Sequence, residues 1–218
     1  MKKVNLGIIG LGYIGEAHLR NSLHLNEVDV SAVADLSKKA LKKAQEMGVK
    51  NCYENYSDLL NQKDMDAVVI SLPNFLHHKC AIEAFEQGKN VFLEKPMATS
   101  VGEAKDIVRA AENRSLKLMI GYPMRFQEKY SRLGEKISSG CLGDIEIVQA
   151  SYIGGGPFFH RADGHIPSPV PDWWFNKELT GGGVIMDLGC HMINLLRWFF
   201  GEVKDIRSYL GYRFNFDF

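Results

Sequence analysis

Residues 4–15 read VNLGIIGLGYIG, and this stretch decides the fold of the first half of the chain. The run Val4–Ile9 is typical of a strand and leads into a G-x-G-x-x-G pattern at Gly10, Gly12 and Gly15. The first glycine allows a tight turn, the second lets a pyrophosphate approach the backbone, and the third lets helix and strand pack closely. Three glycines could also merely build a turn. Strand, glycine pattern, helix, strand and acidic residue in this order favour a dinucleotide site, whose helix N-terminus attracts phosphates.

An acidic residue stands where a dinucleotide site requires one. Asp35 follows Gly15 by 20 residues and comes directly after the predicted second strand, Val28–Ala34. Its carboxylate could accept hydrogen bonds from the adenosine ribose, and it would repel a 2′-phosphate. The pattern favours NAD, with NADP as the second candidate because Lys38 and Lys39 could offset the repulsion. The predicted contacts in this region are Gly10, Gly12, Tyr13, Ile14, Gly15 and Asp35.

The first 121 residues alternate short apolar runs with helical patterns, the order that gives parallel strands joined by helices. The run Ala67–Ile70 is apolar at every position, as expected for a strand covered on both faces. Ser37 is a predicted helix cap and Gly48 the predicted end of that helix. We therefore predict a doubly wound Rossmann domain over residues 1–121. Further predicted elements are the strands Ala67–Ser71, Asn90–Leu93 and Lys117–Ile120 and the helices Phe75–Gln87 and Ser100–Asn113.

The alternation of apolar runs and helical patterns stops after Gly121, and residues 122–218 are predicted to form a second α/β domain. The segment Gly154–Gly183 is rich in proline and glycine, a composition that predicts an ordered loop or lid. The predicted elements of this domain are the helices Glu128–Ser139 and Val184–Phe200 and the strand regions Ile145–Ile153 and Val203–Phe216.

The charge balance argues against several classes of partner. The chain has 26 Lys+Arg and 26 Asp+Glu, so its formal net charge is +0. Without a positive field, nucleic acid and anionic membranes are poor partners. Apolar stretches such as Ala67–Leu72 and Val184–Leu188 fall short of the ~20 residues that a membrane span needs, and the N-terminus does not resemble a signal peptide. We therefore expect a soluble cytoplasmic protein.

Cysteine and histidine spacing gives no metal site. The chain contains no CxxC pair, which predicts reduced thiols instead of a zinc site or a disulfide framework. His160 and His165 lie in the proline-rich segment without an evident partner. We predict no metal. The four cysteines are Cys52, Cys80, Cys141 and Cys190.

Lys95 lies at the edge of the predicted sheet where ligands bind. The sequence Glu94-Lys95-Pro96 follows a predicted strand, and the carboxyl ends of parallel strands form the ligand crevice. Pro96 disfavours helical geometry at the residue before it, so Lys95 can be held at the edge and point into the crevice. A surface Lys-Pro pair is the alternative.

Asp187 and His191 are four residues apart on a predicted helix and therefore share a face. Such a pair can exchange protons, bind a metal or simply stabilise the helix. The missing third ligand argues against a metal, and the residues alone leave the other two readings open.

Five motifs occur in a fixed order from Val4 to about Gly201. The ordered set resembles the glucose–fructose oxidoreductase, inositol dehydrogenase and rhizopine-catabolism (Gfo/Idh/MocA) family. The motifs are Gly10-x-Gly12-x-x-Gly15, Pro73-Asn74-x-x-His77, Glu94-Lys95-Pro96, Arg125-Phe126, and Gly181-Gly182-Gly183-x-x-x-Asp187-x-Gly189-x-His191.

The resemblance implies a fold and an activity. The fold is a Rossmann domain followed by an α/β domain whose open, mainly antiparallel sheet covers the nicotinamide and forms the interface of a homo-oligomer. The activity is hydride transfer between a nicotinamide cofactor and a ring carbon of a sugar, nucleotide sugar or cyclitol. Two alternatives are an NAD-dependent glycosidase that oxidises its sugar transiently and a non-catalytic dinucleotide- or sugar-binding protein.

The resemblance also assigns roles to individual residues. Lys95 matches the lysine that binds the reacting hydroxyl and helps to orient the nicotinamide. Asp187 matches the substrate-binding aspartate and His191 the acid–base histidine. The remaining predicted cofactor contacts are Ser71, Pro73, Asn74, His77 and Glu94.

Two further side chains are candidates for substrate binding. Trp173 could stack on a sugar ring, although such aromatics more often lie in a core. Arg125 could hold a carboxylate or a phosphate, with a surface ion pair as the alternative.

The chain departs from the family pattern in two positions and in length. Asn194 stands where the family often has aspartate, and Gln127-Glu128 stands where a proline is common. Only 95 residues follow Pro123, which is short for the family's sheet. We therefore expect the C-terminal domain to be incomplete in this chain and the dehydrogenase activity to belong to the complete protein.

Overall fold

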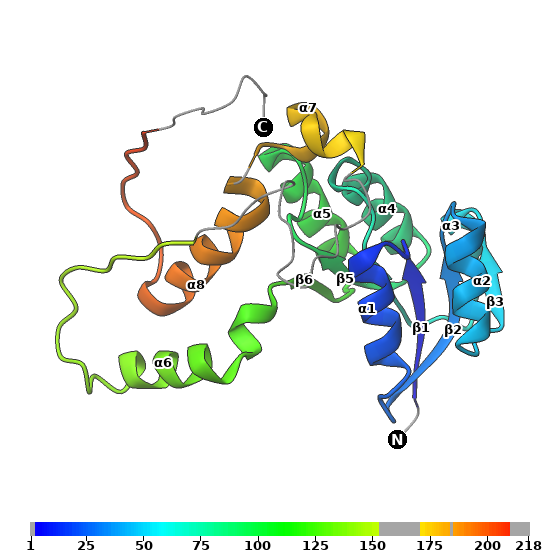
Figure 1. Ribbon diagram of the computed structural model, residues 1–218, viewed down its shortest axis with the longest axis horizontal. Helices are drawn as coiled ribbons and strands as arrows, with labels where there is room; N and C mark the ends of the chain where they lie inside the picture. The colour runs from blue at the N-terminus through cyan, green and yellow to red at the C-terminus, as the bar shows by residue number, and fades with distance from the viewer. Residues whose placement is uncertain (1–2, 153–170, 184, 210–218) are drawn as a thin grey trace, which may run out of the picture. The chain divides into compact units, whose positions relative to one another are not determined.

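The computed structural model describes residues 3–152, 171–183 and 185–209 (Figure 1). They belong to two compact units, Met1–Gly121 and Tyr122–Phe218. Each unit is described by itself.

Unit 1 contains a six-stranded sheet in the order β3-β2-β1-β4-β5-β6, and all its neighbouring strands are parallel. β1 pairs with β2 on one side and β4 on the other, so the strand order changes direction at β1. The crevice at the carboxyl ends of such strands is where doubly wound sheets bind ligands. The strands are β1 (Val4–Ile9), β2 (Val28–Ala34), β3 (Asn51–Tyr53), β4 (Ala67–Ile70), β5 (Asn90–Glu94) and β6 (Leu118–Gly121).

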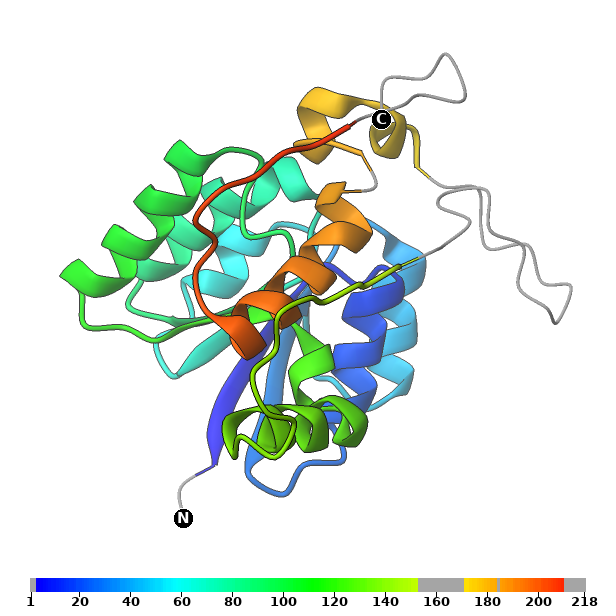
Figure 2. The same ribbon diagram turned by 90° about the vertical axis from the view of Figure 1, so that its left-hand side faces the viewer.

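Helices cover both faces of this sheet (Figures 1 and 2). Ile9 packs in a core formed with α3, α4 and α5, whereas its neighbour Ile8 packs in a core formed with α1 and α2. Both side chains are fully buried. This confirms the predicted parallel Rossmann sheet. The helices are α1 (Tyr13–Ser22), α2 (Lys38–Glu46), α3 (Tyr56–Leu60), α4 (Asn74–Glu86) and α5 (Val101–Asn113).

The predicted cap and end of α2 are confirmed. The sequence analysis also missed one strand and one helix. The Ser37 hydroxyl accepts a hydrogen bond from the Ala40 amide at 3.3 Å, and Gly48 follows the helix with φ +99°. The sequence analysis did not predict β3 and α3. Three and five residues are too few to display a period, and these elements are defined by their packing against β2 and α4.

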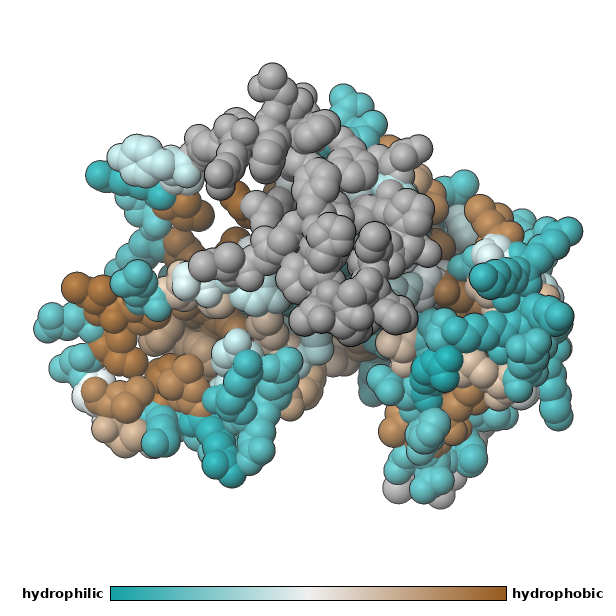
Figure 3. Space-filling model, viewed as in Figure 1, coloured by the Kyte–Doolittle hydropathy of each residue, from teal (hydrophilic) through white to brown (hydrophobic). Residues whose placement is uncertain are grey.

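The regular elements in the described residues of unit 2 are all helical. Its elements are the 3₁₀ helices η1 (Pro123–Phe126) and η3 (Asp172–Phe175), the α-helices α6 (Glu128–Ser138), α7 (Lys177–Thr180) and α8 (Cys190–Phe200), and the π-helical turn η4 (Ile185–Gly189). α6 packs against α8, where a Cβ at Gly134 would lie 3.4 Å from the Phe199 ring. Large apolar side chains of both helices remain exposed, including Leu133, Trp198 and Phe200, and Figure 3 shows hydrophobic residues over these helices.

One helix predicted for unit 2 is confirmed over Ile185–Phe200, where its first turn is π-helical and the rest is α8. Glycine at 183 and 189 weakens regular α-helix at this start, and Val184 lies outside the described residues. The predicted strands do not form in residues 145–152 and 203–209, because a strand needs a hydrogen-bonded neighbour and the described residues of this unit supply none. Ile153 and residues 210–216 lie outside the described residues, as does most of Gly154–Gly183. The predicted antiparallel sheet is therefore not shown.

One stretch of unit 2 is apolar enough to cross a membrane by length and composition alone. It runs from Lys177 to Phe200, and its most apolar 18-residue window has a mean hydropathy of 1.2. Left-handed glycines at 181 and 182 separate α7 from the rest of it, and core helices of soluble proteins pass the same test. This observation is weak evidence for a membrane span.

Lys89 provides a test of the core of unit 1. The residue is only 4% exposed, and its ammonium group donates hydrogen bonds to the carbonyl oxygens of Gln62 at 2.5 Å and Met65 at 3.1 Å. Lys89→Met removes both donors, so we expect the free energy of unfolding in urea to fall by about 1–3 kcal/mol. The exposed Lys105→Met of α5 should change it by less than about 0.5 kcal/mol. Equal values for the two variants would contradict this role of Lys89.

Candidate active site

The turn between β1 and α1 is fixed by the ends of two neighbouring strands. The Gly10 amide donates to the carbonyl oxygen of Ala34 at 2.8 Å, and the Ser71 hydroxyl donates to the carbonyl oxygen of Gly10 at 2.9 Å. Gly10 has φ +87°, and a Cβ there would lie 2.5 Å from the Ser71 carbonyl oxygen. Gly10 therefore makes the tight turn that the sequence predicts, and Ser71, a predicted cofactor contact, supports it.

The other two glycines of the pattern play different parts. A Cβ at Gly15 would lie 1.9 Å from the Gly10 carbonyl oxygen, so the start of α1 packs directly on the turn. A Cβ at Gly12 would meet no atom within 4 Å, and no side chain caps α1 at this residue. The space beside Gly12 is open at a helix N-terminus, where a pyrophosphate fits. Tyr13 and Ile14 begin α1 at the same place.

Asp35 is held beside this turn by two backbone amides. Its Oδ2 accepts a hydrogen bond from the Leu11 amide at 2.6 Å, and its Oδ1 accepts one from the Ser37 amide at 2.7 Å. Each carboxylate oxygen can accept a further bond, so the group can still bind a ribose hydroxyl. The ammonium group of Lys38 lies 3.4 Å from the Glu54 carboxylate, a pairing that reduces its ability to offset the charge of Asp35.

Glu94 and Lys95 lie at the end of β5, on the same edge of the sheet. One oxygen of Glu94 lies 2.8 Å from Nε2 of His18, and the other accepts a hydrogen bond from the Lys95 amide at 3.2 Å. The sequence analysis missed His18. The one sequence feature that could have indicated His18 is its position, three residues after Gly15 on the helix that follows the glycine pattern.

His77 lies in a buried environment between two backbone carbonyl groups. Its ring is 1% exposed, with Nδ1 2.8 Å from the carbonyl oxygen of Pro96 and Nε2 2.8 Å from that of Leu72. Burial lowers the pKa of His77, although the two carbonyl groups oppose that shift. The ring therefore lies against the backbone of two loops, and its place on the cofactor side of the cleft stays a prediction. Pro73 and Asn74 lie at the start of the same helix, α4.

Asp187 and His191 lie on successive elements of unit 2. Asp187 is in the π-helical turn η4 and His191 in the first turn of α8; such turns often occur at functional sites. The Tyr122 ring meets the His191 ring edge to face, with centroids 5.9 Å apart. Burial, assisted by Cys190, raises the pKa of Tyr122 to about 12. The phenol therefore stays protonated near neutral pH.

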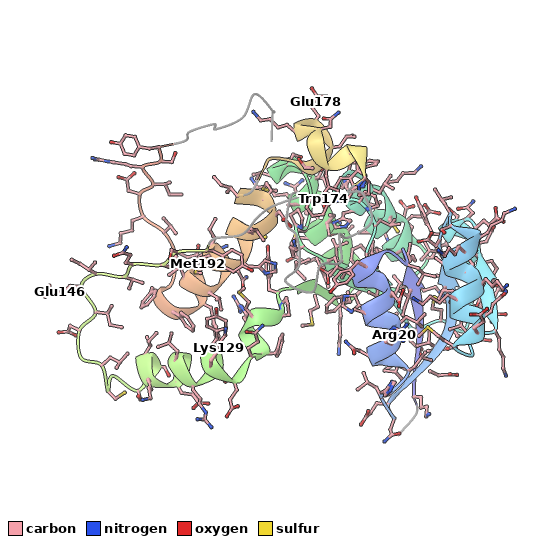
Figure 4. The ribbon with its side chains drawn as sticks, in the orientation of Figure 1. Arg20, Lys129, Glu146, Trp174, Glu178 and Met192 are labelled. Carbon is pink, nitrogen blue, oxygen red and sulfur yellow. The ribbon has the colours of Figure 1, made fainter. Side chains whose placement is uncertain are left out.

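Arg125 and Trp173 are both engaged within unit 2. Nε of Arg125 donates a hydrogen bond to Oδ1 of Asn194 at 2.7 Å, and its guanidinium group lies 5.5 Å from the centre of the Trp198 ring. Asn194, which departs from the family pattern, thus orients Arg125 without a charge. Trp173 is half-buried beside Trp174, which is labelled in Figure 4, with ring centroids 5.5 Å apart.

The structure gathers one predicted group at the carboxyl edge of the sheet in unit 1. This group contains the three glycines, Asp35, Ser71, Glu94 and Lys95. Asp187, His191, Arg125 and Trp173 lie in unit 2. Tyr122 was missed because its importance depends on a contact with His191 across 69 residues of sequence. Within the described ranges, no group of three or more His, Cys, Asp or Glu residues could hold a metal ion, and His160 and His165 lie outside those ranges.

Comparison with known proteins gives two family matches. Residues 4–122 match the model of the Gfo/Idh/MocA oxidoreductase family with an NAD-binding Rossmann fold. Residues 130–216 match a model of the Gfo/Idh/MocA C-terminal domain. Together the two matches cover most of both units.

Individual relatives share a quarter to a third of their aligned residues with the chain. Levoglucosan dehydrogenase from Pseudarthrobacter phenanthrenivorans is 27% identical over 97% of this chain and 55% of its own length. A glycosyl hydrolase family 109 protein from Shewanella pealeana is 31% identical over 70% of this chain and 36% of its own. The crystal structure of scyllo-inositol dehydrogenase from Lactobacillus casei with bound NAD(H) and scyllo-inositol has a TM-score of 0.74 and 27% identity, covering 92% of this chain and 57% of that one. The chain thus spans about half the length of the curated relatives that it matches first.

The glycines allow ligand binding and folding to be separated. A valine at position 12 enters open space, so Gly12→Val should change the free energy of unfolding by less than about 1 kcal/mol while NAD binding, measured by calorimetry, is largely lost. In Gly15→Ala the new Cβ would overlap the Gly10 carbonyl oxygen, so the free energy of unfolding should fall by at least about 1–3 kcal/mol. Unchanged NAD affinity in Gly12→Val would contradict the proposed pyrophosphate position.

Tyr122 should ionise only at high pH. A phenol whose pKa is raised above its unfolded value of about 10 contributes stability below that pH and loses it as the pH rises towards about 12. Ultraviolet titration should show one phenolate fewer near pH 12 in Tyr122→Phe than in the unmodified protein. The variant should also lose less unfolding free energy than the parent above pH 10. Ionisation of Tyr122 near pH 10 would contradict its burial.

Proposed function

The chain belongs to the Gfo/Idh/MocA family of NAD-binding oxidoreductases, and from this premise we propose that it transfers a hydride between NAD and a ring carbon of a sugar, nucleotide sugar or cyclitol. The observation that carries the proposal is the open space beside Gly12 at the N-terminus of α1, with the Asp35 carboxylate fixed next to it. This arrangement suits the pyrophosphate and ribose of NAD. The bound cofactor supplies the hydride acceptor or donor, and the chain supplies binding and orientation.

The substrate class rests on relatives. The names of two of them include levoglucosan and scyllo-inositol, an anhydrosugar and a cyclitol. Both substrates are polyols with a ring carbon that bears a hydroxyl group. We extend this class to the present chain as a proposal, together with a cytoplasmic location and a homo-oligomeric state.

The chain offers a group for each task of such a reaction. We assign Lys95 to the substrate oxygen, where its positive charge stabilises negative charge that develops as the proton leaves. We assign His191 as the proton acceptor, since imidazole exchanges protons near neutral pH. Asp187 would hydrogen-bond a substrate hydroxyl or orient the imidazole. The Tyr122 phenol beside His191 keeps its proton, so it is not the base.

A transient-oxidation glycosidase is the second candidate, because one relative is a glycosyl hydrolase family 109 protein. Such an enzyme cleaves a glycoside without net formation of NADH. A third outcome, a binding protein, would take up NAD and leave every substrate unchanged.

A substrate screen separates these functions. The full chain is incubated with NAD or NADP and with levoglucosan, scyllo-inositol, myo-inositol, a UDP-sugar or an aryl glycoside, and reduced cofactor and released phenol are followed by absorbance. We expect reduced cofactor with at least one polyol, and more with NAD than with NADP because Asp35 repels a 2′-phosphate. Phenol release without net reduction would support the glycosidase. NAD binding with no product would support the binding protein.

Substitution of the two proposed catalytic groups tests their roles. Lys95→Ala and His191→Ala should each lower turnover by about 10²–10⁴-fold, because each loses a charge-stabilising or proton-transfer group. NAD affinity measured by calorimetry should change little. The exposed Lys105→Ala and His24→Ala serve as controls and should retain the parent turnover. Normal turnover of either proposed catalytic variant would reject the assigned role.

A further inference from the structure

The tripeptide Glu94–Pro96 is contacted on both sides of Lys95 by histidines from two different helices. His18 of α1 meets the side chain of Glu94, and His77 of α4 meets the carbonyl oxygen of Pro96. The two contacts join segments 76 and 19 residues apart in the sequence. Lys95 itself lies between them.

The contact before Lys95 is partly shielded from solvent. Nε2 of His18 lies 2.8 Å from Oε1 of Glu94, with the side chains 25% and 15% exposed. The His18 ring also packs edge-on against Phe92 of β5, with centroids 5.2 Å apart and an interplanar angle of 67°. Two contacts with the same strand fix the orientation of the imidazole.

The Glu94 carboxylate passes this restraint to the backbone of Lys95. Its Oε2 accepts the hydrogen bond from the Lys95 amide at 3.2 Å. On another side the carboxylate lies against Gly121 of β6, where a Cβ would be 2.9 Å from Oε1. With His18 on one oxygen and the Lys95 amide on the other, the carboxylate holds that amide in one place.

The contact after Lys95 is buried completely. His77 is 1% exposed, and its two ring nitrogens each lie 2.8 Å from a carbonyl oxygen, that of Pro96 and that of Leu72. Leu72 follows β4, and Pro96 follows β5. A neutral imidazole has one N–H, so the ring donates a hydrogen bond to one of these oxygens and packs against the other. It therefore lies between the two loops at the carboxyl ends of neighbouring strands and restrains the residue that follows Lys95.

We propose that His18 and His77 are positioning residues that fix the backbone of Lys95 from both sides. His18 acts through Glu94, and His77 acts through Pro96. The lysine is thereby held in a defined place before a ligand binds, and its ammonium group needs less reorganisation at the substrate oxygen. The effect of this positioning on hydride transfer rests on the function proposed above, whereas the restraint of the Lys95 backbone does not depend on that function.

The test uses the full chain with two variants that remove the contacts and two that restore a donor. His18→Leu and His77→Leu lose the ring nitrogens, whereas His18→Gln and His77→Gln keep an N–H that can donate. His24→Leu and His78→Leu are matched controls, since His24 follows α1 and contacts the Arg20 carbonyl, and His78 neighbours His77 on α4 and pairs with Asp106. Amide hydrogen exchange by mass spectrometry, NAD affinity by calorimetry and the kinetic constants for a screened polyol are measured on each.

The proposal predicts a local effect. In both leucine variants the Lys95 amide should exchange about tenfold faster while amides of β1 and β4 keep their rates, and kcat should fall by up to about 10²-fold with little change in KM or NAD affinity. The glutamine variants should recover a part of both losses, and the two controls should match the parent. If His77→Leu does not fold, the exchange rates and kinetic constants of His18→Leu and of the two glutamine variants test the proposal.

Two results would overturn the proposal. One is an unchanged Lys95 amide in His18→Leu and, where it folds, in His77→Leu. The other is faster exchange throughout unit 1, which would make the histidines general stabilisers of the fold. A parent protein that oxidises or reduces no polyol would contradict the proposed function, and hydrogen exchange would still decide whether the two histidines fix Lys95.

Discussion

The close approach of the backbone at Gly10 to Gly15 is the constraint on which the rest of unit 1 depends. A side chain at Gly15 would overlap the Gly10 carbonyl oxygen, so α1 can begin directly over the end of β1 only because that residue has no Cβ. The same turn receives the Ser71 hydroxyl from the end of β4 and the Asp35 carboxylate from the end of β2. Three strand ends thus meet at one turn, and the open space beside Gly12 lies there.

A second set of contacts extends this edge towards the proposed catalytic lysine. Side chains from α1 and α4 reach across the edge to the residues before and after Lys95. These contacts are sheltered, and the buried ring of His77 loses less to solvent competition than an exposed pair would. The proposed phosphate site and the placement of Lys95 therefore depend on the same helix, because α1 carries Gly15 at its start and His18 one turn later.

Unit 2 contributes a different kind of chemistry. The imidazole of His191 lies beside a phenol that burial keeps neutral, and Arg125 is oriented by the uncharged amide of Asn194 and by the face of Trp198. An aspartate at position 194 would add a negative charge beside Arg125. With asparagine there, no carboxylate at this position compensates the positive charge of the guanidinium group.

The sequence by itself determined the local features of this protein. Continuous apolar runs predicted strands buried on both faces, and the bounds of α4, α5, β5 and β6 agree with the prediction within one residue. The glycine pattern located the turn between β1 and α1, because the steric needs of a turn are set by adjacent residues. Only the tertiary structure decided the strand order, the short elements β3 and α3, the absence of strands in residues 145–152, and the partners of His18, His77 and Tyr122. Periodicity reports which face of an element is buried, but a hydrogen bond between residues 76 positions apart depends on how whole elements pack, and no local pattern encodes that.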